Sequence, residues 1–247
     1  MGNVANISMT DRPGWANRLL GGRIADNDLA ALLAVSRAVR LEANATALRA
    51  HEDRLLLLVR GTVKAHLVTD DGDEVITAIQ GPGHAAGLLH VLGHAEIGVD
   101  ITSLEPIDAL TVSGPEFRSL LEQRSSIMAG CLRTVASQHA AANAERARFA
   151  GTCISQRVAS RLLELATRWG QPDGDRVHIT LPLTQEELAA WSGASRESVA
   201  KVLQAMRASG LLETGRRSLT VLDLPRLQQR CDRSAPDDLG QLLATIR

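Results

Sequence analysis

The residues between 195 and 201 combine side chains that can read DNA. They are Ser195, Arg196, Glu197, Ser198 and Lys201. An arginine can donate two hydrogen bonds to O6 and N7 of guanine, a glutamate can accept one from N4 of cytosine, and a lysine can reach a guanine or a phosphate. Serine hydroxyl groups can bind phosphate oxygens. If this run forms the first turns of an exposed helix, it could enter a major groove and contact base edges.

The neighbouring residues predict the elements that would position this run. Thr184 is placed to N-cap a first helix, with Glu187 completing a capping box, and the exposed start of that helix makes Thr184 and Gln185 candidate DNA contacts. Gly193 then interrupts the helix, and Ser195 begins a second one. The apolar residues that recur at helical spacing in this second helix, and should face inward, are Val199, Val202, Leu203 and Met206. The pattern predicts a helix-turn-helix.

A β-hairpin is predicted directly after the second helix. Residues 211–222 read as a short strand, a turn at Gly215-Arg216-Arg217 and an alternating strand. A helix-turn-helix followed by such a hairpin is a winged helix, in which Arg216 and Arg217 would contact phosphates. The alternative is a helical hairpin with a charged, solvated face, and the β-hairpin makes the winged helix the better interpretation.

This region resembles the DNA-binding domain of the Crp/Fnr family of bacterial transcription regulators. The resemblance rests on Leu-Thr-Gln-Glu-Glu-Leu-Ala from 183, Gly-Ala-Ser-Arg-Glu-Ser-Val-Ala-Lys-Val-Leu from 193, and Gly-Leu-Leu from 210. In that family a Ser-Arg-Glu-x-Val-x-Arg/Lys motif reads a TGTGA-like half-site, and here Ser195 to Lys201 carry it. The resemblance implies a homodimer on a pseudo-palindromic site of double-stranded DNA, with RNA polymerase as a further partner.

The composition limits the other classes of function. The chain has 247 residues, 45% hydrophobic and 22% charged, which is enough for two domains, and no segment has the length of a membrane span. Residues 1–22 lack the apolar core of a secretory signal, so we expect a cytoplasmic protein. The net charge of −1 gives no general basic surface, so DNA binding must depend on where the basic residues lie. The sequence shows no nucleophile paired with a base, so it does not predict an enzyme.

The first half of the chain predicts a helix and then a small antiparallel barrel. An amphipathic helix is expected over 28–39, followed by strands over 55–60, 61–69, 74–80 and 107–113. The runs Leu-Leu-Leu-Leu-Val-Arg-Gly-Thr-Val-Lys, Asp-Asp-Gly-Asp-Glu and Gly-Pro-Gly-His resemble the cyclic-nucleotide-binding barrel of the same family. The resemblance therefore extends over about residues 26 to 225.

The effector pocket that the resemblance implies is degenerate. A cyclic nucleotide needs a carboxylate for its ribose and an arginine for its phosphate, which the family takes from a Gly-Glu-Leu segment and a later Arg-Ser pair. The matching positions here are Gly87, Leu88 and Leu89, then Ile97 and Gly98, so both charged partners are apolar. Without the arginine, the binding free energy of a cyclic nucleotide loses a charge-assisted contact of about 2 to 3 kcal/mol. We expect neither family-typical cyclic AMP binding nor a resident cofactor.

Two further features of this pocket point the same way. The Thr-Ser pair that contacts adenine in the family matches Ala142 and Asn143, so only Asn143 keeps a hydrogen-bonding group. His84, His90 and His94 lie near the degenerate segment, but no cysteine or aspartate completes a ligand set beside them, so loop or surface histidines are the simpler interpretation and no metal is expected.

A long helix is expected over 115–149. Its residues at alternating spacings of three and four, typical of a two-stranded coiled coil, are Met128, Cys131, Val135, Gln138, Ala142, Glu145 and Phe149. In the family this helix pairs with its twin; alternatively the stripe packs on the chain's own barrel. Cys131 on that seam is either a small inert hydrophobe or a redox sensor, since Arg124 and Arg133 could lower the pKa of its thiol. The widely spaced cysteines 131, 153 and 231 predict neither disulfides nor a metal site.

We therefore expect an α+β chain with an N-terminal cyclic-nucleotide-binding-like antiparallel β-barrel, a long dimerisation helix and a C-terminal winged helix-turn-helix. The expected limits are a flexible N-terminus over 1–25, the barrel over 26–114, the long helix over 115–150, the winged helix over 151–225 and a helical extension over 226–247. The alternatives are a ligand-independent architectural DNA binder, or a cyclic-nucleotide or redox sensor whose helix-turn-helix is only structural.

Overall fold

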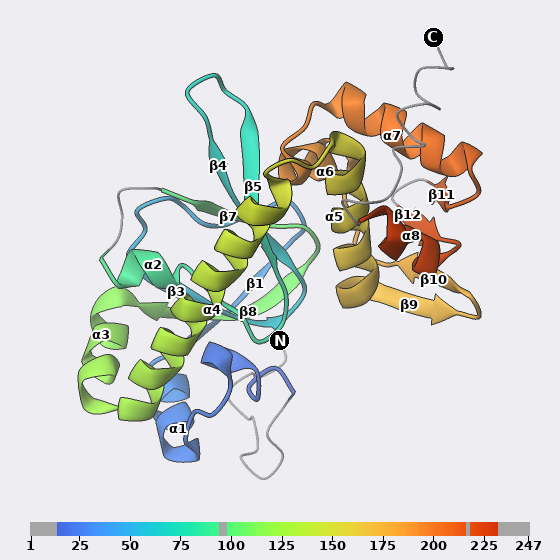
Figure 1. Cartoon of the computed structure of the whole chain (residues 1–247). Coiled ribbons are helices and arrows are strands. Elements are labelled where there is room, and N and C mark those ends of the chain that lie inside the picture. Colours follow the sequence, from blue (N-terminus) through green and yellow to red (C-terminus); the bar gives the residue numbers. More distant parts are fainter. Residues whose placement is uncertain (1–13, 94–97, 216–217, 232–247) are drawn as a thin grey trace. The chain divides into compact units, whose positions relative to one another are not determined.

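The computed structural model describes residues 14–93, 98–215 and 218–231 (Figure 1). They fall into two compact units, one made of the described residues of Met1–Val68 and Ile76–Asn143, the other of those of Thr69–Val75 and Ala144–Arg247. The division lies inside the helix α4 (Ser125–Phe149). Among the described residues, no helix combines the length and the apolar character needed to cross a bilayer.

The strands of the first half of the chain form two four-stranded sheets that enclose an apolar interior. One sheet has the order β1-β8-β3-β6 and the other β2-β7-β4-β5. The strands are β1 (Arg37–Leu41), β2 (Thr46–Leu48), β3 (Arg54–Arg60), β4 (Val63–Val68), β5 (Glu74–Gln80), β6 (Ala85–Ala86), β7 (Asp100–Ser103) and β8 (Ile107–Ser113). The side chains between them include Leu48, Leu56, Leu58, Val63, Ile101 and Ile107. The expected antiparallel barrel is confirmed.

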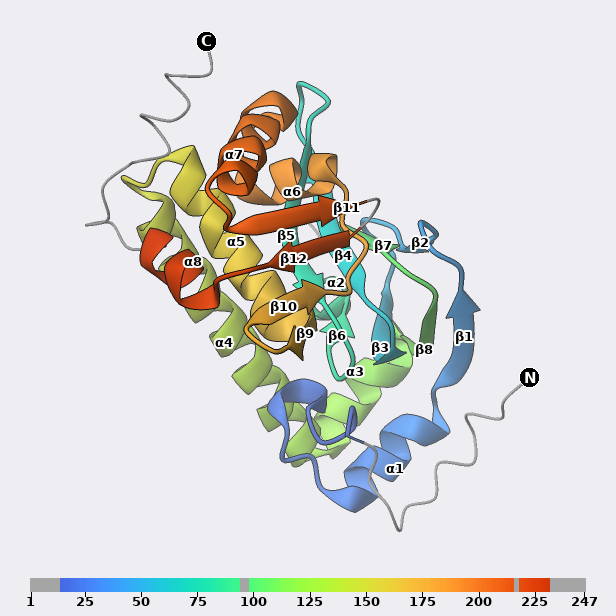
Figure 2. The same ribbon diagram turned by 90° about the vertical axis from the view of Figure 1, so that its right-hand side faces the viewer.

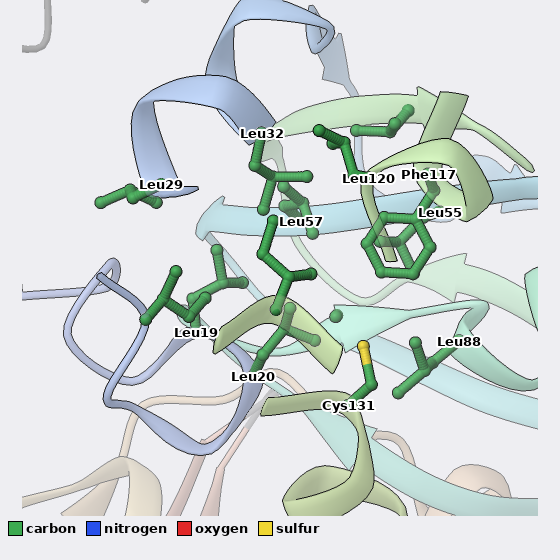
Figure 3. Packing of buried hydrophobic residues seen from close by; sticks show 14 of the residues in the cluster. Leu19, Leu20, Leu29, Leu32, Leu55, Leu57, Leu88, Phe117, Leu120 and Cys131 are labelled. Carbon is green, nitrogen blue, oxygen red and sulfur yellow. The ribbon is translucent and has the colours of Figure 1, made fainter. Parts of the chain in front are cut away.

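A second apolar core, called the helix-side core below, lies between the sheet that contains β3 and the helices of the first unit. The helical elements are η2 (Leu19–Gly21), α1 (Asp26–Ala34), α2 (Leu88–Val91), α3 (Gly114–Gln123) and the first turns of α4. Figure 3 shows side chains of this core: Leu19, Leu20, Leu29, Leu32, Leu88, Phe117, Leu120 and Cys131 come from the helical elements, and Leu55 and Leu57 from β3. Leu19 and Leu20 are almost completely buried here, so the described part of the expected flexible N-terminus packs into the core.

Two of the expected helices have different limits. The helix expected over 28–39 ends at Ala34, because Arg37–Leu41 pair with Ile107–Thr111 as an edge strand of the first sheet. The helix expected over 115–149 is broken at Arg124, whose backbone is extended. The Asp28 carboxylate lies at this break, 3.5 Å from Arg124 Nη1 and accepting a 2.6 Å hydrogen bond from the Ser126 hydroxyl. The long helix is therefore two helices, α3 and α4.

The second unit is a winged helix. Its elements are α5 (Ile154–Trp169), β9 (Gly170–Asp173), β10 (Arg176–Ile179), α6 (Gln185–Ser192), α7 (Arg196–Ala208), β11 (Leu212–Gly215), β12 (Ser218–Val221) and α8 (Leu224–Arg230). The strands form one antiparallel sheet in the order β11-β12-β10-β9, seen face-on in Figure 2. Helices α5, α6 and α7 pack together, and α8 packs on α5. The extension beyond Cys231 lies outside the described residues.

Candidate nucleic-acid interface

Side-chain caps fix where both helices of the helix-turn-helix begin. The Glu187 backbone N–H donates to the Thr184 hydroxyl at 3.1 Å, and the Thr184 backbone N–H donates to the Glu187 carboxylate at 2.9 Å, so the expected capping box is present. Gly193, with a φ of 58°, ends α6 in the left-handed conformation that glycine adopts most easily. Ser195 caps α7 by accepting from the Ser198 N–H at 3.2 Å.

Helix α7 separates an apolar face from a polar one, as expected. Its buried residues include Val199, Val202, Leu203 and Met206. Arg196, Glu197 and Lys201 are exposed, and Arg196 makes no hydrogen bond or ion pair with another residue that the structure describes. The described geometry therefore leaves the Arg196 guanidinium available to the edge of a base.

Glu197 and Lys201 form an ion pair along the exposed face of α7. Lys201 Nζ lies 2.8 Å from Glu197 Oε1, one helical turn away. The hydrogen bond from Lys201, together with its positive charge, holds the pKa of the Glu197 carboxyl below its usual value. Glu197 is therefore ionised at neutral pH and can only accept hydrogen bonds, as a contact to cytosine N4 requires.

Three of the candidate phosphate-binding hydroxyl groups already take part in hydrogen bonds within the protein. The Thr184 hydroxyl donates to Glu187, and the Ser195 hydroxyl donates to that of Ser198 at 2.9 Å, so all three serve the helix caps first. Gln185, at the start of α6, is exposed. The wing residues Arg216 and Arg217 lie outside the described residues.

The wing is attached to the end of α7 by hydrogen bonds that the sequence did not reveal. Arg207 Nη1 donates to the Thr214 hydroxyl of β11 at 2.7 Å. Arg226 Nη1, on α8, donates to the Ser209 carbonyl at 3.0 Å. These contacts hold the hairpin and α8 against the C-terminal end of α7.

The described residues of the degenerate effector segment differ in how they pack. Leu88 is buried in the helix-side core, where the family motif has a carboxylate, whereas Leu89 is exposed. Gly87 has a φ of 81°, and a Cβ there would lie 2.7 Å from the Arg54 carbonyl oxygen. A Cβ on Gly98 would lie 2.5 Å from that of Ala50. Both glycines are therefore required by close packing, with no ligand needed to explain them.

Of the two remaining effector candidates, Asn143 and Ile97, the structure describes only Asn143. Asn143, on α4, is exposed and pairs with His139 at 3.0 Å, while Ile97 and His94 lie outside the described residues. His90 is buried, and burial lowers the pKa of its imidazole, so the ring is neutral at neutral pH. His84 Nδ1 lies 3.0 Å from the Gly81 carbonyl oxygen.

The side chain of Cys131 faces inward from α4, as in the alternative in which the stripe packs on the chain's own barrel. Its side chain is 2% exposed and packs in the helix-side core with Leu20 and Leu88 (Figure 3). Burial raises the pKa of its thiol to about 12, which opposes formation of the thiolate on which a redox sensor depends. The packing favours the small inert hydrophobe, and the redox role stays a prediction.

The comparisons with known proteins cover both halves of the chain. The cyclic nucleotide-binding domain matches residues 38–124, and the Crp-like helix-turn-helix domain matches residues 156–230. The CRP-like cAMP-activated global transcriptional regulator of Mycobacterium tuberculosis is 32% identical to the chain over 178 residues, which cover 72% of this chain and 80% of that protein. The global nitrogen regulator of Synechococcus elongatus is 24% identical, over 72% of this chain and 81% of its own length. The first of these relatives is named as a transcriptional regulator and the second as a global nitrogen regulator.

Solved structures share the fold at lower identity. The c-di-GMP responsive global regulator of Xanthomonas campestris superposes with a TM-score of 0.70 at 19% identity, over 80% of this chain and 99% of that one. A transcriptional regulator of the CRP family from Thermus thermophilus gives a TM-score of 0.67 at 24% identity, over 78% and 96%. The order of barrel, helix and winged helix is therefore common to all three chains.

Proposed function

Because this chain belongs to the Crp/Fnr family of bacterial transcription regulators, we propose that it acts as a homodimer on a specific pseudo-palindromic DNA site. Its place of action is then the cytoplasm, where it would meet the chromosome and RNA polymerase. The observation that carries the proposal is the division of α7 into a buried apolar face and an exposed face with Arg196, Glu197 and Lys201. Those three residue types suit the base edges of a major groove.

The sequence of α7 supports a particular half-site. Ser195, Arg196, Glu197, Val199 and Lys201 keep the family's Ser-Arg-Glu-x-Val-x-Arg/Lys pattern, so we propose a TGTGA-like half-site. Arg196 would read a guanine, and Glu197 would accept from a cytosine on the opposite strand. The wing residues Arg216 and Arg217 and the caps of α6 would contact phosphates, which positions the protein without reading sequence.

The homodimer is supported by an apolar patch on α4. Met128 and Leu132, one helical turn apart, are 38% and 65% exposed, and they are among the few large hydrophobic side chains left open in the described chain. Apolar side chains repeated at this spacing along a helix are suited to pairing with a second copy of the same helix. A two-fold dimer would place two copies of α7 about 34 to 36 Å apart, one turn of DNA.

The effector is proposed to differ from the one that activates the Mycobacterium tuberculosis relative. That relative is named as activated by cyclic AMP. Here the position that matches the ribose-binding glutamate is Leu88, which is buried in the chain's own core, and the position that matches the phosphate-binding arginine is Ile97. Calorimetry should therefore show cyclic AMP binding far weaker than a charged pocket would give. Micromolar binding that is abolished by a substitution within the segment from Gly87 to Gly98 would overturn this part of the proposal.

Selection from random DNA tests the proposed function. The full chain is incubated with a library of random duplexes, and the bound fraction is amplified and then footprinted. The proposal expects a protected pseudo-palindrome with TGTGA-like halves. Protection without sequence preference would indicate an architectural protein instead. A complete lack of protection would mean that the helix-turn-helix is only structural.

A further inference from the structure

The second unit contains a buried arginine on α5, Arg161, whose side chain is only 5% exposed. It lies in none of the segments that carry the candidate DNA contacts. Its three guanidinium nitrogens each have an acceptor: Nη2 donates to the Glu145 carboxylate of α4, Nη1 to Glu164 on its own helix at 3.3 Å, and Nε to the Trp191 carbonyl of α6 at 3.0 Å. A charge taken out of water is tolerated only when it is paired in this way.

The flat faces of the same guanidinium are covered by two aromatic rings. Its central carbon lies 5.1 Å from the centroid of the Phe149 ring and 4.4 Å from that of the Trp191 ring. Phe149 is at the end of α4, and Trp191 is in the last turn of α6, 3% exposed. Only an arginine offers both the planar stack and the fork of donors, so a lysine cannot replace it.

A second arginine on the same face of α5, Arg157, lies against one of the same two rings. Arg157 lies one helical turn before Arg161, and its guanidinium carbon is 5.5 Å from the Phe149 ring. Its Nη1 lies 3.5 Å from where a Cβ on Gly193 would be, that is, beside the turn of the helix-turn-helix. Both arginines therefore contact the end of α4 on one side and the segment 191–193 on the other.

These contacts are all internal to the second unit. Glu145 and Phe149 follow Asn143, the last residue of the first unit, so the final turns of α4 are part of the same compact unit as the winged helix. The carbonyl of Trp191 that Arg161 holds is two residues before Gly193 and four before the cap of α7. A shift of this carbonyl would move the turn that sets the start of α7.

We infer that Arg161 is a positioning residue: by clamping the end of α4 to the last turn of α6, it fixes the turn from which the DNA-reading face of α7 begins. The inference rests on the proposed function, because it concerns the placement of Arg196 and Glu197. It assigns to Arg161 an effect on sequence preference although the residue is buried and touches no candidate DNA contact.

The test compares three variants of the full chain. Arg161→Met keeps an unbranched apolar stem and removes the guanidinium with its charge and its donors. Glu145→Gln weakens the same clamp from α4. Arg168→Met is the matched control, because Arg168 is on the same helix, pairs with Glu164 at 2.9 Å and stacks on Trp169 at 4.4 Å, yet both of these partners lie on α5 itself. Each variant is measured for binding to the selected palindrome and to a scrambled duplex.

If Arg161 holds the end of α4 to the last turn of α6 as inferred, Arg161→Met should lower affinity for the palindrome by about tenfold to a hundredfold, since hydrogen bonds to a charged group are lost. Affinity for the scrambled duplex should change much less. Glu145→Gln should show a smaller loss of the same kind, and Arg168→Met should behave as the wild type. A wild type without preference for the palindrome would contradict the proposed function, whereas a wild type with preference and an Arg161→Met variant equal to Arg168→Met would overturn the inference alone.

Hydrogen exchange separates positioning from a general loss of stability and needs no DNA. In Arg161→Met, amides of residues 145–150 and 191–195 should exchange faster, while the rest of α5 and the sheet β9–β12 stay protected. Uniformly faster exchange across the whole unit would mean that Arg161 only stabilises the fold. If Arg161→Met does not fold, Arg161→Lys takes its place: it keeps the charge but not the stack, and should show the same two local increases. A wild-type exchange pattern in Arg161→Lys would then overturn the clamp.

Discussion

Lys201 lies one helical turn beyond Glu197 on α7, and its Nζ is 2.8 Å from Glu197 Oε1. The pair lowers the pKa of the Glu197 carboxyl, so this group stays negative at every pH at which DNA binding is measured. A bare carboxylate on a DNA-reading helix would be repelled by phosphates, and the ammonium of Lys201 offsets that repulsion. If α7 reads DNA as proposed, the pair would allow Glu197 to contact a base.

The first prediction separates the two roles within this pair. Lys201→Ala should weaken binding to all duplexes and lower the slope of log affinity against log salt by about one, because one cation is lost and Glu197 is left unbalanced. The double variant with both Lys201→Ala and Glu197→Gln should recover affinity for scrambled DNA without recovering preference for the selected site. Anisotropy titrations across a salt series measure both effects. A Lys201→Ala variant with the wild-type affinity and slope would show that this face of α7 does not meet DNA.

The second prediction concerns the reactivity of Cys131. With the pKa of its thiol raised to about 12, the thiolate is scarce at pH 8, and the surrounding core also blocks access. Iodoacetamide should therefore label the half-buried Cys153 and Cys231 well before Cys131, which should react only when the protein is unfolded. Mass spectrometry of timed samples gives the three rates. Labelling of Cys131 as fast as Cys153 in the folded protein would restore the redox-sensor hypothesis.

The third prediction addresses the dimer. Leu132→Glu places a charge where the most exposed large apolar side chain of α4 now lies, and it should shift the protein from dimer to monomer in analytical ultracentrifugation. Binding to the full palindrome should weaken more than binding to a single half-site. Because Leu132 packs in neither core, the melting temperature of the chain's domains should change little. A variant that remains dimeric at micromolar concentration would place the interface elsewhere.

The helix-turn-helix could be predicted closely because its determinants are local. The caps of α6 and α7 join residues three apart, Thr184 with Glu187 and Ser195 with Ser198, and such pairs can be recognised in the sequence alone. The same holds for the turn at Gly193, where a left-handed backbone favours glycine. The buried stripe of α7 follows from the period of the helix.

The features that could not be predicted depend on partners far away in the sequence. Arg161 binds residues 16 positions before and 30 positions after it, so nothing in its neighbourhood distinguishes it from a solvated arginine. The sequence places Met128 and Cys131 on one stripe of α4, but Met128 is exposed whereas Cys131 is buried. Cys131 faces inward because the N-terminal segment covers it, with Arg133 donating to the Gly22 carbonyl 111 residues earlier. The break at Arg124 likewise depends on Asp28.

Base reading by α7 is proposed to depend on Arg196, so binding is measured after this side chain is removed. Wild type, Arg196→Ala and the control Gln204→Ala, also an exposed residue of α7, are titrated against the selected palindrome, against palindromes changed at each base pair, and against scrambled DNA. Arg196→Ala should lose about 1 to 3 kcal/mol on the palindrome and tolerate a change at one guanine, with little loss on scrambled DNA. Gln204→Ala should match the wild type. Equal weakening of Arg196→Ala on palindrome and scrambled DNA would mean that Arg196 does not read a base.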